Sequence, residues 1–176
     1  MWYVLHVTSG KELDIAAALR TRQMISYVPR ENRAIRRGGK WTFKEYTLFP
    51  GYVFVNLDYT AENYYKVCGP SGIPGVQRFL GPDGLHPSSL SYLEAEWIKI
   101  LSGSGEPIAA TPAQLTPEGE VQLGNGVLQN FLSRIIKIDK HSRRATVEIT
   151  VCGEARQLEL SFDLLSEDSN SESDGG

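Results

Sequence analysis

A stretch without any apolar period divides this sequence of 176 residues into two unequal parts. The stretch is "SGSGEPIAATPAQLTP" (102–117), and its wealth of Gly, Ser, Pro and Ala is typical of a flexible linker. We therefore expect two domains, one at residues 1–101 and a smaller one at 118–165.

The first segment alternates strand and helix patterns. The helix expected at 9–22 begins with Ser9, and Glu12 follows at the spacing of a capping box. Two further strands at 27–37 and 40–46 flank a Gly-Gly pair, which is a hairpin signature. The other patterns predict helices at 60–68 and 87–101, and strands at 2–7, 51–57 and 75–81, the first of them apolar on both faces and therefore central. This order predicts an α/β sandwich with helices packed on an antiparallel sheet.

The second segment has strand patterns and no convincing helix. Val147, Ile149 and Val151 alternate with polar residues, as a half-buried strand requires. Four short strands are expected, at 119–124, 133–139, 144–151 and 154–161. Short strands in so small a segment predict a small β-barrel, so the expected fold class of the whole chain is α+β.

The net charge of −3 conceals an uneven distribution. Four acidic residues and no basic ones lie in "SEDSNSESDGG" (166–176), a polar, low-complexity tail that we expect to be disordered. The remaining sequence has 18 basic and 17 acidic residues. The placement of these charges therefore matters more than their sum.

No known catalytic or cofactor motif occurs in the chain. His6, His86 and His141 lack metal-ligand spacing, and Cys68 and Cys152 are too isolated for a disulfide framework or a zinc site. We expect no catalytic residues, no metal and no cofactor. The start of the sequence has no signal-peptide pattern and no run approaches a membrane span, so a monomeric cytoplasmic protein without membrane contact is expected.

Two clusters of basic residues stand out. The first, "RENRAIRRGGKW" (30–41), lies on the predicted hairpin, and the second, "RIIKIDKHSRR" (134–144), surrounds a predicted turn of the barrel. Ordinary polarity of solvated loops is one interpretation. The other is nucleic-acid binding, in which guanidinium and ammonium groups contact backbone phosphates. The candidate residues are Arg33, Arg36, Arg37 and Lys40 in the first cluster, and Arg134, Lys137, Lys140, Arg143 and Arg144 in the second.

Aromatic residues gather in "EYTLFPGYVFVNLD" (45–58), around a Pro50–Gly51 turn. Along the following strand, Tyr52 and Phe54 share one face, and the valines between and after them share the other. The valines suit a core beneath helices. The aromatics suit either a second core or a partner-covered surface, and strand periodicity alone leaves both open.

These segments together resemble a known family. "WYVLHVTSGKE", "YVPRENRAIRRGGKW", "LFPGYVFV" and "GVQRFLG" are similar to the NusG N-terminal (NGN) domain, which has a ferredoxin-like fold. "GEVQLGNGVLQNF", "IIKIDKHSRRATVEI" and "LELSFDLL" are similar to the SH3-like KOW barrel that follows it. The barrel departs from the family pattern: Gly126 matches a family glycine, but Asn130 and Ser133 replace two others.

The resemblance implies a transcription elongation factor and not an enzyme. It implies that an apolar depression of the N-terminal domain grips the clamp helices of the largest RNA polymerase subunit and thereby suppresses pausing. It also implies contact with the non-template DNA strand. The polymerase-binding residues implied here are Phe49, Tyr52 and Phe54, with Trp2 and Tyr3 as neighbours.

Three departures favour a specialised paralogue (LoaP- or RfaH-like) over the general factor. They are the glycine-rich loop "CGPSGIPG" (68–75), the altered glycine pattern and the basic rim of the barrel. We expect the barrel to bind a nascent RNA hairpin and so recruit the protein to particular operons. The alternative is a general adaptor whose barrel binds a ribosomal or termination protein and no nucleic acid. A ribosome-associated KOW protein and a small enzyme are weaker alternatives.

Overall fold

The computed structural model describes residues 1–83 and 86–165. They form two compact units, and neither is continuous in sequence. The first unit consists of residues 1–30, 47–107 and 150–156, and the second of 31–46, 108–149 and 157 onward. The acidic tail expected to be disordered lies outside the described residues. The division of the chain into consecutive domains at 1–101 and 118–165 stays a prediction.

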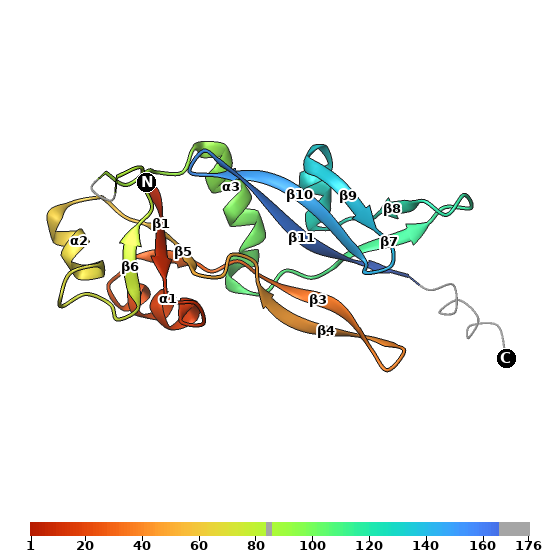
Figure 1. The fold of residues 1–176 in the computed structure, drawn as a ribbon, viewed down its shortest axis with the longest axis horizontal. Coiled ribbons are helices and arrows are strands. Elements are labelled where there is room, and N and C mark those ends of the chain that lie inside the picture. The colour runs from red at the N-terminus through yellow and green to blue at the C-terminus, as the bar shows by residue number, and fades with distance from the viewer. Residues whose placement is uncertain (84–85, 166–176) are drawn as a thin grey trace. The chain divides into compact units, whose positions relative to one another are not determined.

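A four-stranded antiparallel sheet forms the centre of the first unit (Figure 1). Its strands are β1 (Trp2–Val7), β2 (Ile25–Tyr27), β5 (Tyr52–Asn56) and β6 (Val76–Phe79), in the order β2-β5-β1-β6. β1 is an inner strand, and Val4 and Leu5, which point to opposite faces, are both fully buried. The expectation of a central first strand is thus confirmed, because only an inner strand covered on both sides can bury both residues.

The core of this unit lies between the sheet and α1 (Glu12–Thr21). Val53 and Val55 of β5 belong to it, as the alternation in the sequence predicted. They pack in one cluster with Ile15 and Leu19 of the helix. Fully burying an aliphatic side chain of this size stabilises a fold by about 1.5–3 kcal/mol.

Two other helices begin at polar caps. Thr60 caps α2 (Ala61–Val67) by accepting a hydrogen bond of 3.1 Å from the Asn63 backbone N–H. Ser91 and Glu94 form a capping box at the start of α3 (Tyr92–Leu101), so this helix begins later than residue 87, where the pattern predicted it. A single 3-10 turn, η1 (Gly103–Gly105), follows α3.

The capping box predicted at Ser9 is wrong, because Glu12 has a different role. Its buried carboxylate accepts hydrogen bonds from the backbone N–H of Gly10 at 2.9 Å and of Gly51 at 2.8 Å. α1 has no side-chain cap of its own. Gly51 has a φ of +83°, a conformation that favours glycine. Glu12 therefore fixes the Pro50–Gly51 turn against the start of α1.

Replacing Glu12 by Ala should lower the free energy of unfolding by about 1–3 kcal/mol, since it leaves the buried Gly51 N–H without an acceptor. Urea unfolding of the full chain measures this change. Asp14→Ala is the matched control, because Asp14 is an exposed acidic residue in the same helical turn. Equal effects of the two substitutions would contradict the assigned role of Glu12.

The second unit contains a five-stranded sheet with the order β8-β7-β11-β10-β9. Its inward residues include Val147, Ile149 and Phe162, so the predicted alternation of the third strand is confirmed. β7 and β11 are parallel neighbours. The strands are β7 (Thr111–Leu115), β8 (Val121–Leu123), β9 (Ile135–Asp139), β10 (Arg144–Val151) and β11 (Glu154–Leu164).

Two expectations for this region were wrong. β7 lies inside the segment 102–117 that the composition predicted to be a linker. Its inward side chains, Thr111 and Ala113, are too small to give an apolar signal, although both are buried. A 3-10 segment, η2 (Val127–Arg134), lies where no helix was expected, and it buries Leu128 and Phe131.

The predicted Gly-Gly hairpin is present as β3 (Arg30–Arg37) and β4 (Lys40–Thr47), which pair as a separate two-stranded sheet (Figure 1). Gly38 and Gly39 have φ values of +55° and +77°, as a two-residue turn of this kind requires. Within the second unit, the buried Glu31 carboxylate accepts a hydrogen bond of 3.0 Å from the Ser161 backbone N–H. The Ala34 N–H donates to the Ser161 hydroxyl at 3.2 Å, so the base of the hairpin is held on β11.

Candidate binding surfaces

The register of β1 on β5 places several aromatic residues on the sheet face opposite α1. Residues that stand opposite each other on paired strands share a face of the sheet. On this basis the face opposite the α1 core carries three cross-strand pairs: Trp2 with Asn56, Val4 with Phe54, and His6 with Tyr52. Tyr27 of β2 also stands opposite Phe54.

The aromatic residues predicted to bind polymerase differ in exposure. Phe54 and Phe49 are 0% and 6% exposed, and their rings lie edge to face with centroids 5.2 Å apart. Trp2 and Tyr52 are only half-buried. Tyr3 is buried on the opposite face, in the α1 core, where its ring meets that of Phe79. The accessible predicted residues on this face are thus Trp2 and Tyr52.

Tyr27 belongs to the same surface and was not predicted. Its ring stacks on Trp2 with centroids 4.9 Å apart and an interplanar angle of 12°. Its strand, β2, has only three residues, which is too short for a clear periodic pattern. An open groove of about 770 Å³ lies beside Tyr27. Both polar and apolar residues line it: Arg20, Gln23, Met24, Ile25, Ser26, Ser104, Gly105 and Glu106.

The basic residues of the hairpin fall into two groups. Arg33 has partners within the second unit: it forms an ion pair of 2.6 Å with Glu31 and donates a hydrogen bond to the Glu159 carbonyl at 2.9 Å. The side chains of Arg36, Arg37 and Lys40 are exposed and form no hydrogen bond or ion pair with the rest of the described chain. The turn of the hairpin therefore presents three available cations.

The basic residues of the five-stranded sheet divide in the same way. Arg143 pairs with Asp163 at 3.3 Å and lies 4.0 Å from the centroid of the Trp41 ring. Arg144 donates to the Ala34 carbonyl at 3.1 Å, so both arginines hold the hairpin to the sheet. Lys137 is exposed and has no ion pair in the described chain, whereas the exposed Arg134 and Lys140 each have a partner, which for Lys140 is the Gly119 carbonyl.

The turn between β9 and β10 is shaped by Asp139. Its carboxylate accepts hydrogen bonds from the backbone N–H groups of His141 at 2.9 Å and Ser142 at 3.3 Å. The pKa of Asp139 is lowered, first by its hydrogen bonds from Ser142 and then by that from His141 and the charge of Lys137. These hydrogen bonds favour the ionised form of Asp139 and link its carboxylate to the backbone of the basic turn.

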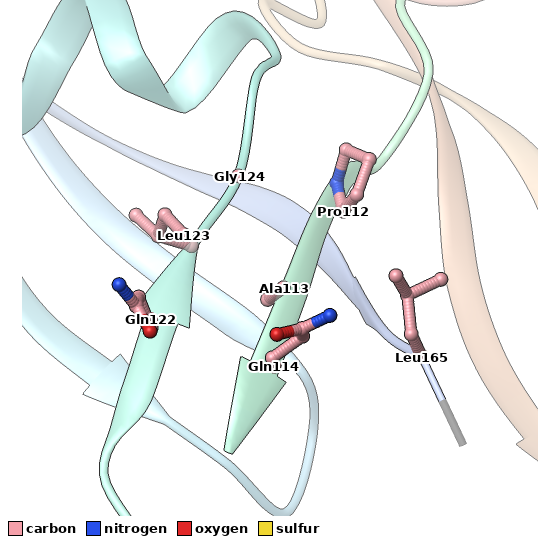
Figure 2. A pocket seen from close by; sticks show the side chains of 7 residues that line it. All are labelled: Pro112, Ala113, Gln114, Gln122, Leu123, Gly124 and Leu165. Carbon is pink, nitrogen blue, oxygen red and sulfur yellow. The ribbon is translucent and has the colours of Figure 1, made fainter. Parts of the chain in front are cut away.

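A small pocket lies between β7 and β8 (Figure 2). It has a volume of about 280 Å³ and contains no charged side chain. Pro112, Ala113, Gln114, Gln122, Leu123, Gly124 and Leu165 line it. With one amide on each strand and no titratable group, the pocket offers no chemistry for catalysis.

Comparison with known proteins identifies the family. The family model described as "Transcription termination factor nusG" matches residues 1–99, which is more than half of the chain. The chain belongs to the NusG family. Members of the NusG family are transcription factors, and the expected α+β fold class agrees with this membership.

Individual NusG proteins match over nearly the whole length. The transcription termination/antitermination protein NusG of Pasteurella multocida is 30% identical over 172 residues, covering 92% of this chain and 91% of its own. That of Bacillus subtilis is 28% identical over 170 residues, with coverages of 92% and 94%. The solved structure titled "Domain interaction in Thermotoga maritima NusG" has a TM-score of 0.52 at 21% identity, with coverages of 91% and 92%, which supports the shared fold.

Other kinds of site find no support in the described part of this NusG-family chain. Residues 1–83 and 86–165 hold no group of His, Cys, Asp and Glu able to bind a metal ion. The helices within them all lack the length and apolar character that crossing a bilayer requires. Both cysteines are free thiols, and burial raises the pKa of each to about 11.

Cys68 and Cys152 should react slowly with thiol reagents at pH 8, because only the thiolate reacts. A rise in pKa from 9.0 to about 11 lowers the thiolate fraction at pH 8 by about 100-fold, and that fraction recovers only as the pH approaches 11. Reaction with a chromogenic disulfide, followed for folded and urea-unfolded protein, measures the difference. Equal rates in the two states would contradict the burial of these thiols.

Proposed function

We propose that this transcription factor of the NusG family binds the clamp helices of the largest RNA polymerase subunit through the aromatic face formed by Trp2, Tyr27 and Tyr52. By holding the clamp it suppresses pausing and promotes processive antitermination. The observation that carries this proposal is the β1–β5 register, which aligns Trp2 and Tyr52 on the face away from α1. The names of the matching relatives refer to transcription termination and antitermination.

The packing of this face suits a helical partner. Phe49 and Phe54 are buried against each other and give the surface a rigid floor. Tyr52 is on the same face of the sheet, with its ring centroid 5.7 Å from that of His6. Partly exposed aromatic rings on a rigid base lose little rotamer entropy when a helix docks on them, and such residues often dominate binding energy.

Tyr52→Ala should weaken polymerase binding by more than about 1 kcal/mol, which is at least about fivefold in affinity. Trp2→Ala and Phe49→Ala should do the same, and because Phe49 is buried, its variant must also pass a thermal unfolding check. Titration of labelled protein against core polymerase measures the affinities. The matched control is Tyr65→Ala, since Tyr65 is 59% exposed on α2. Full affinity in a folded Tyr52→Ala protein would contradict the proposal.

We further propose that the basic surface of the second unit binds a nascent RNA hairpin and that the protein is a specialised paralogue. Arg36, Arg37 and Lys40 on the hairpin, and Lys137 on β9, are exposed and have no ion pair within the described chain. RNA helices can be recognised by such cations through shape and phosphate placement. Contact with the non-template DNA strand, which the family resemblance implies, stays a prediction.

A protein partner for the same sheet is the second candidate. Leu132, Ile136 and Ile138 are 53%, 54% and 40% exposed, and they lie on or next to β9. Apolar side chains gathered on a surface are typical of protein docking sites, such as one for a ribosomal or termination protein. Reversing two of these charges together, at Arg37 and Lys137, separates the candidates. It should abolish RNA binding and leave the binding of a protein to the apolar side chains largely intact.

RNA binding by the full chain should depend steeply on salt. Lys137→Glu and Arg37→Glu should each remove one phosphate contact and lower the slope of log K against log salt by about 0.9 for a paired stem. Fluorescence anisotropy with a labelled stem–loop RNA over a salt series measures the slope. Arg78→Glu is the control, since Arg78 is an exposed arginine of the first unit. An affinity that ignores salt, or an equal loss in the control, would contradict the RNA proposal.

A further inference from the structure

β4 exposes aromatic side chains that neither the core nor the proposed phosphate contacts explain. Six of its eight residues are exposed, which is unusual for a strand with this many rings. Phe43 is 54% exposed, and Trp41 is half-buried. Because the two are separated by one residue along the strand, their side chains lie on the same face of the hairpin.

The neighbours of these rings leave their surfaces accessible. A two-residue turn at Gly38–Gly39 places Ala34 across from Phe43 and Arg36 across from Trp41. Ala34 is too small to cover the Phe43 ring. On one side of Trp41, the Arg143 guanidinium lies 4.0 Å from the ring centroid and is itself fixed by Asp163. Trp41 is thereby held in position by a cation–π contact.

The charges around the rings favour an anionic partner. Arg36 lies on this face at its turn end, and Arg37 and Lys40 flank the turn from the opposite face; none of the three makes an ion pair within the described residues. Glu45 is the next residue on the same face, at the other end. A polyanion would therefore lie toward the turn, where the cations are, and away from Glu45.

We propose that Trp41 and Phe43 form a stacking surface for unpaired RNA bases, whose flanking phosphates bind Arg36, Arg37 and Lys40. This inference rests on the proposed RNA binding of the second unit and adds that the ligand offers an unpaired loop. Aromatic rings beside cations are the composition of single-strand binding surfaces, since every base has a face that can stack on a ring.

The spacing of the rings explains why a loop is bound in preference to a stem. Side chains two residues apart on a strand are separated by about 6.8 Å. Successive bases in a nucleic-acid helix are about 3.4 Å apart and cover one another's faces. Two bases can occupy Trp41 and Phe43 together only when they are splayed, as in a hairpin loop.

The test compares two probes with the full-length protein: a labelled stem–loop RNA with an adenine loop, and the same stem as a blunt duplex. Phe43→Ala should weaken binding to the stem–loop by about tenfold or more and leave the duplex affinity unchanged. The salt slope should not change, because no charge is removed. Phe43→Tyr should retain binding, because tyrosine also stacks. Tyr92→Ala removes an 83% exposed ring of the first unit and should have no effect on RNA binding.

A second readout reports on Trp41 directly. Stem–loop RNA should quench part of the tryptophan emission, and Trp41→Phe should abolish that quenching, because Trp2 and Trp97 lie in the first unit. The Trp41→Phe protein should still bind the stem–loop, since phenylalanine also stacks. Quenching that survives in Trp41→Phe would overturn the assignment of this ring.

The remaining outcomes separate this inference from the proposed function. Salt-dependent RNA binding that is indifferent to Phe43→Ala, or a loss that is equal for stem–loop and duplex, would overturn the stacking surface and leave the RNA proposal in place. No binding of either RNA at low salt would overturn both. Equal, Phe43-dependent binding of a DNA stem–loop would overturn RNA as the ligand. A loss of polymerase affinity in Phe43→Ala without any loss of RNA affinity would assign the rings to a protein contact instead.

Discussion

The polymerase proposal depends on which residues of β5 face away from α1, and the hydrogen bond from the Gly51 N–H to the Glu12 carboxylate determines this. It fixes where β5 starts, and therefore which residues of that strand face α1. A shift of one residue would turn Tyr52 and Phe54 toward α1 and move Val53 and Val55 to the opposite face. A buried carboxylate that joins a helix start to a glycine turn is thus a condition for the aromatic surface to exist at all.

Much of the fold could be predicted because some segments carry strong local signals. β1 is apolar on both faces, apolar and polar residues alternate along β10 without a break, and the Gly38–Gly39 pair is typical of a two-residue hairpin turn. β2 and β7 could not be predicted in this way. β2 has three residues, and the inward side chains of β7 are small, so its place in the sheet depends on parallel pairing with β11, far along the chain.

The kinds of residue in the candidate sites could be predicted from the sequence, but which of them are accessible could not. Arg33 and Arg143 resemble Arg36 and Lys137 in sequence, yet the first two have partners within the fold and the last two have none in the described chain. Each of the first two has a partner on a strand more than a hundred residues away, which is Glu159 of β11 for Arg33 and Trp41 of β4 for Arg143. Similarly, alternation along β1 puts Trp2 and Tyr3 on opposite faces, but only the packing of the sheet shows that Tyr3 is the one in the α1 core.

The contact between Glu31 and Ser161 joins residues 130 positions apart, and this has a consequence for biosynthesis. A ribosome releases the hairpin long before it has made β11. Until then the Glu31 carboxylate lacks the two Ser161 donors that it has in the finished fold, and Ala34 has no strand to cover it. The second unit therefore reaches its native packing only after β11 has been made, although the hairpin that belongs to it is synthesised early.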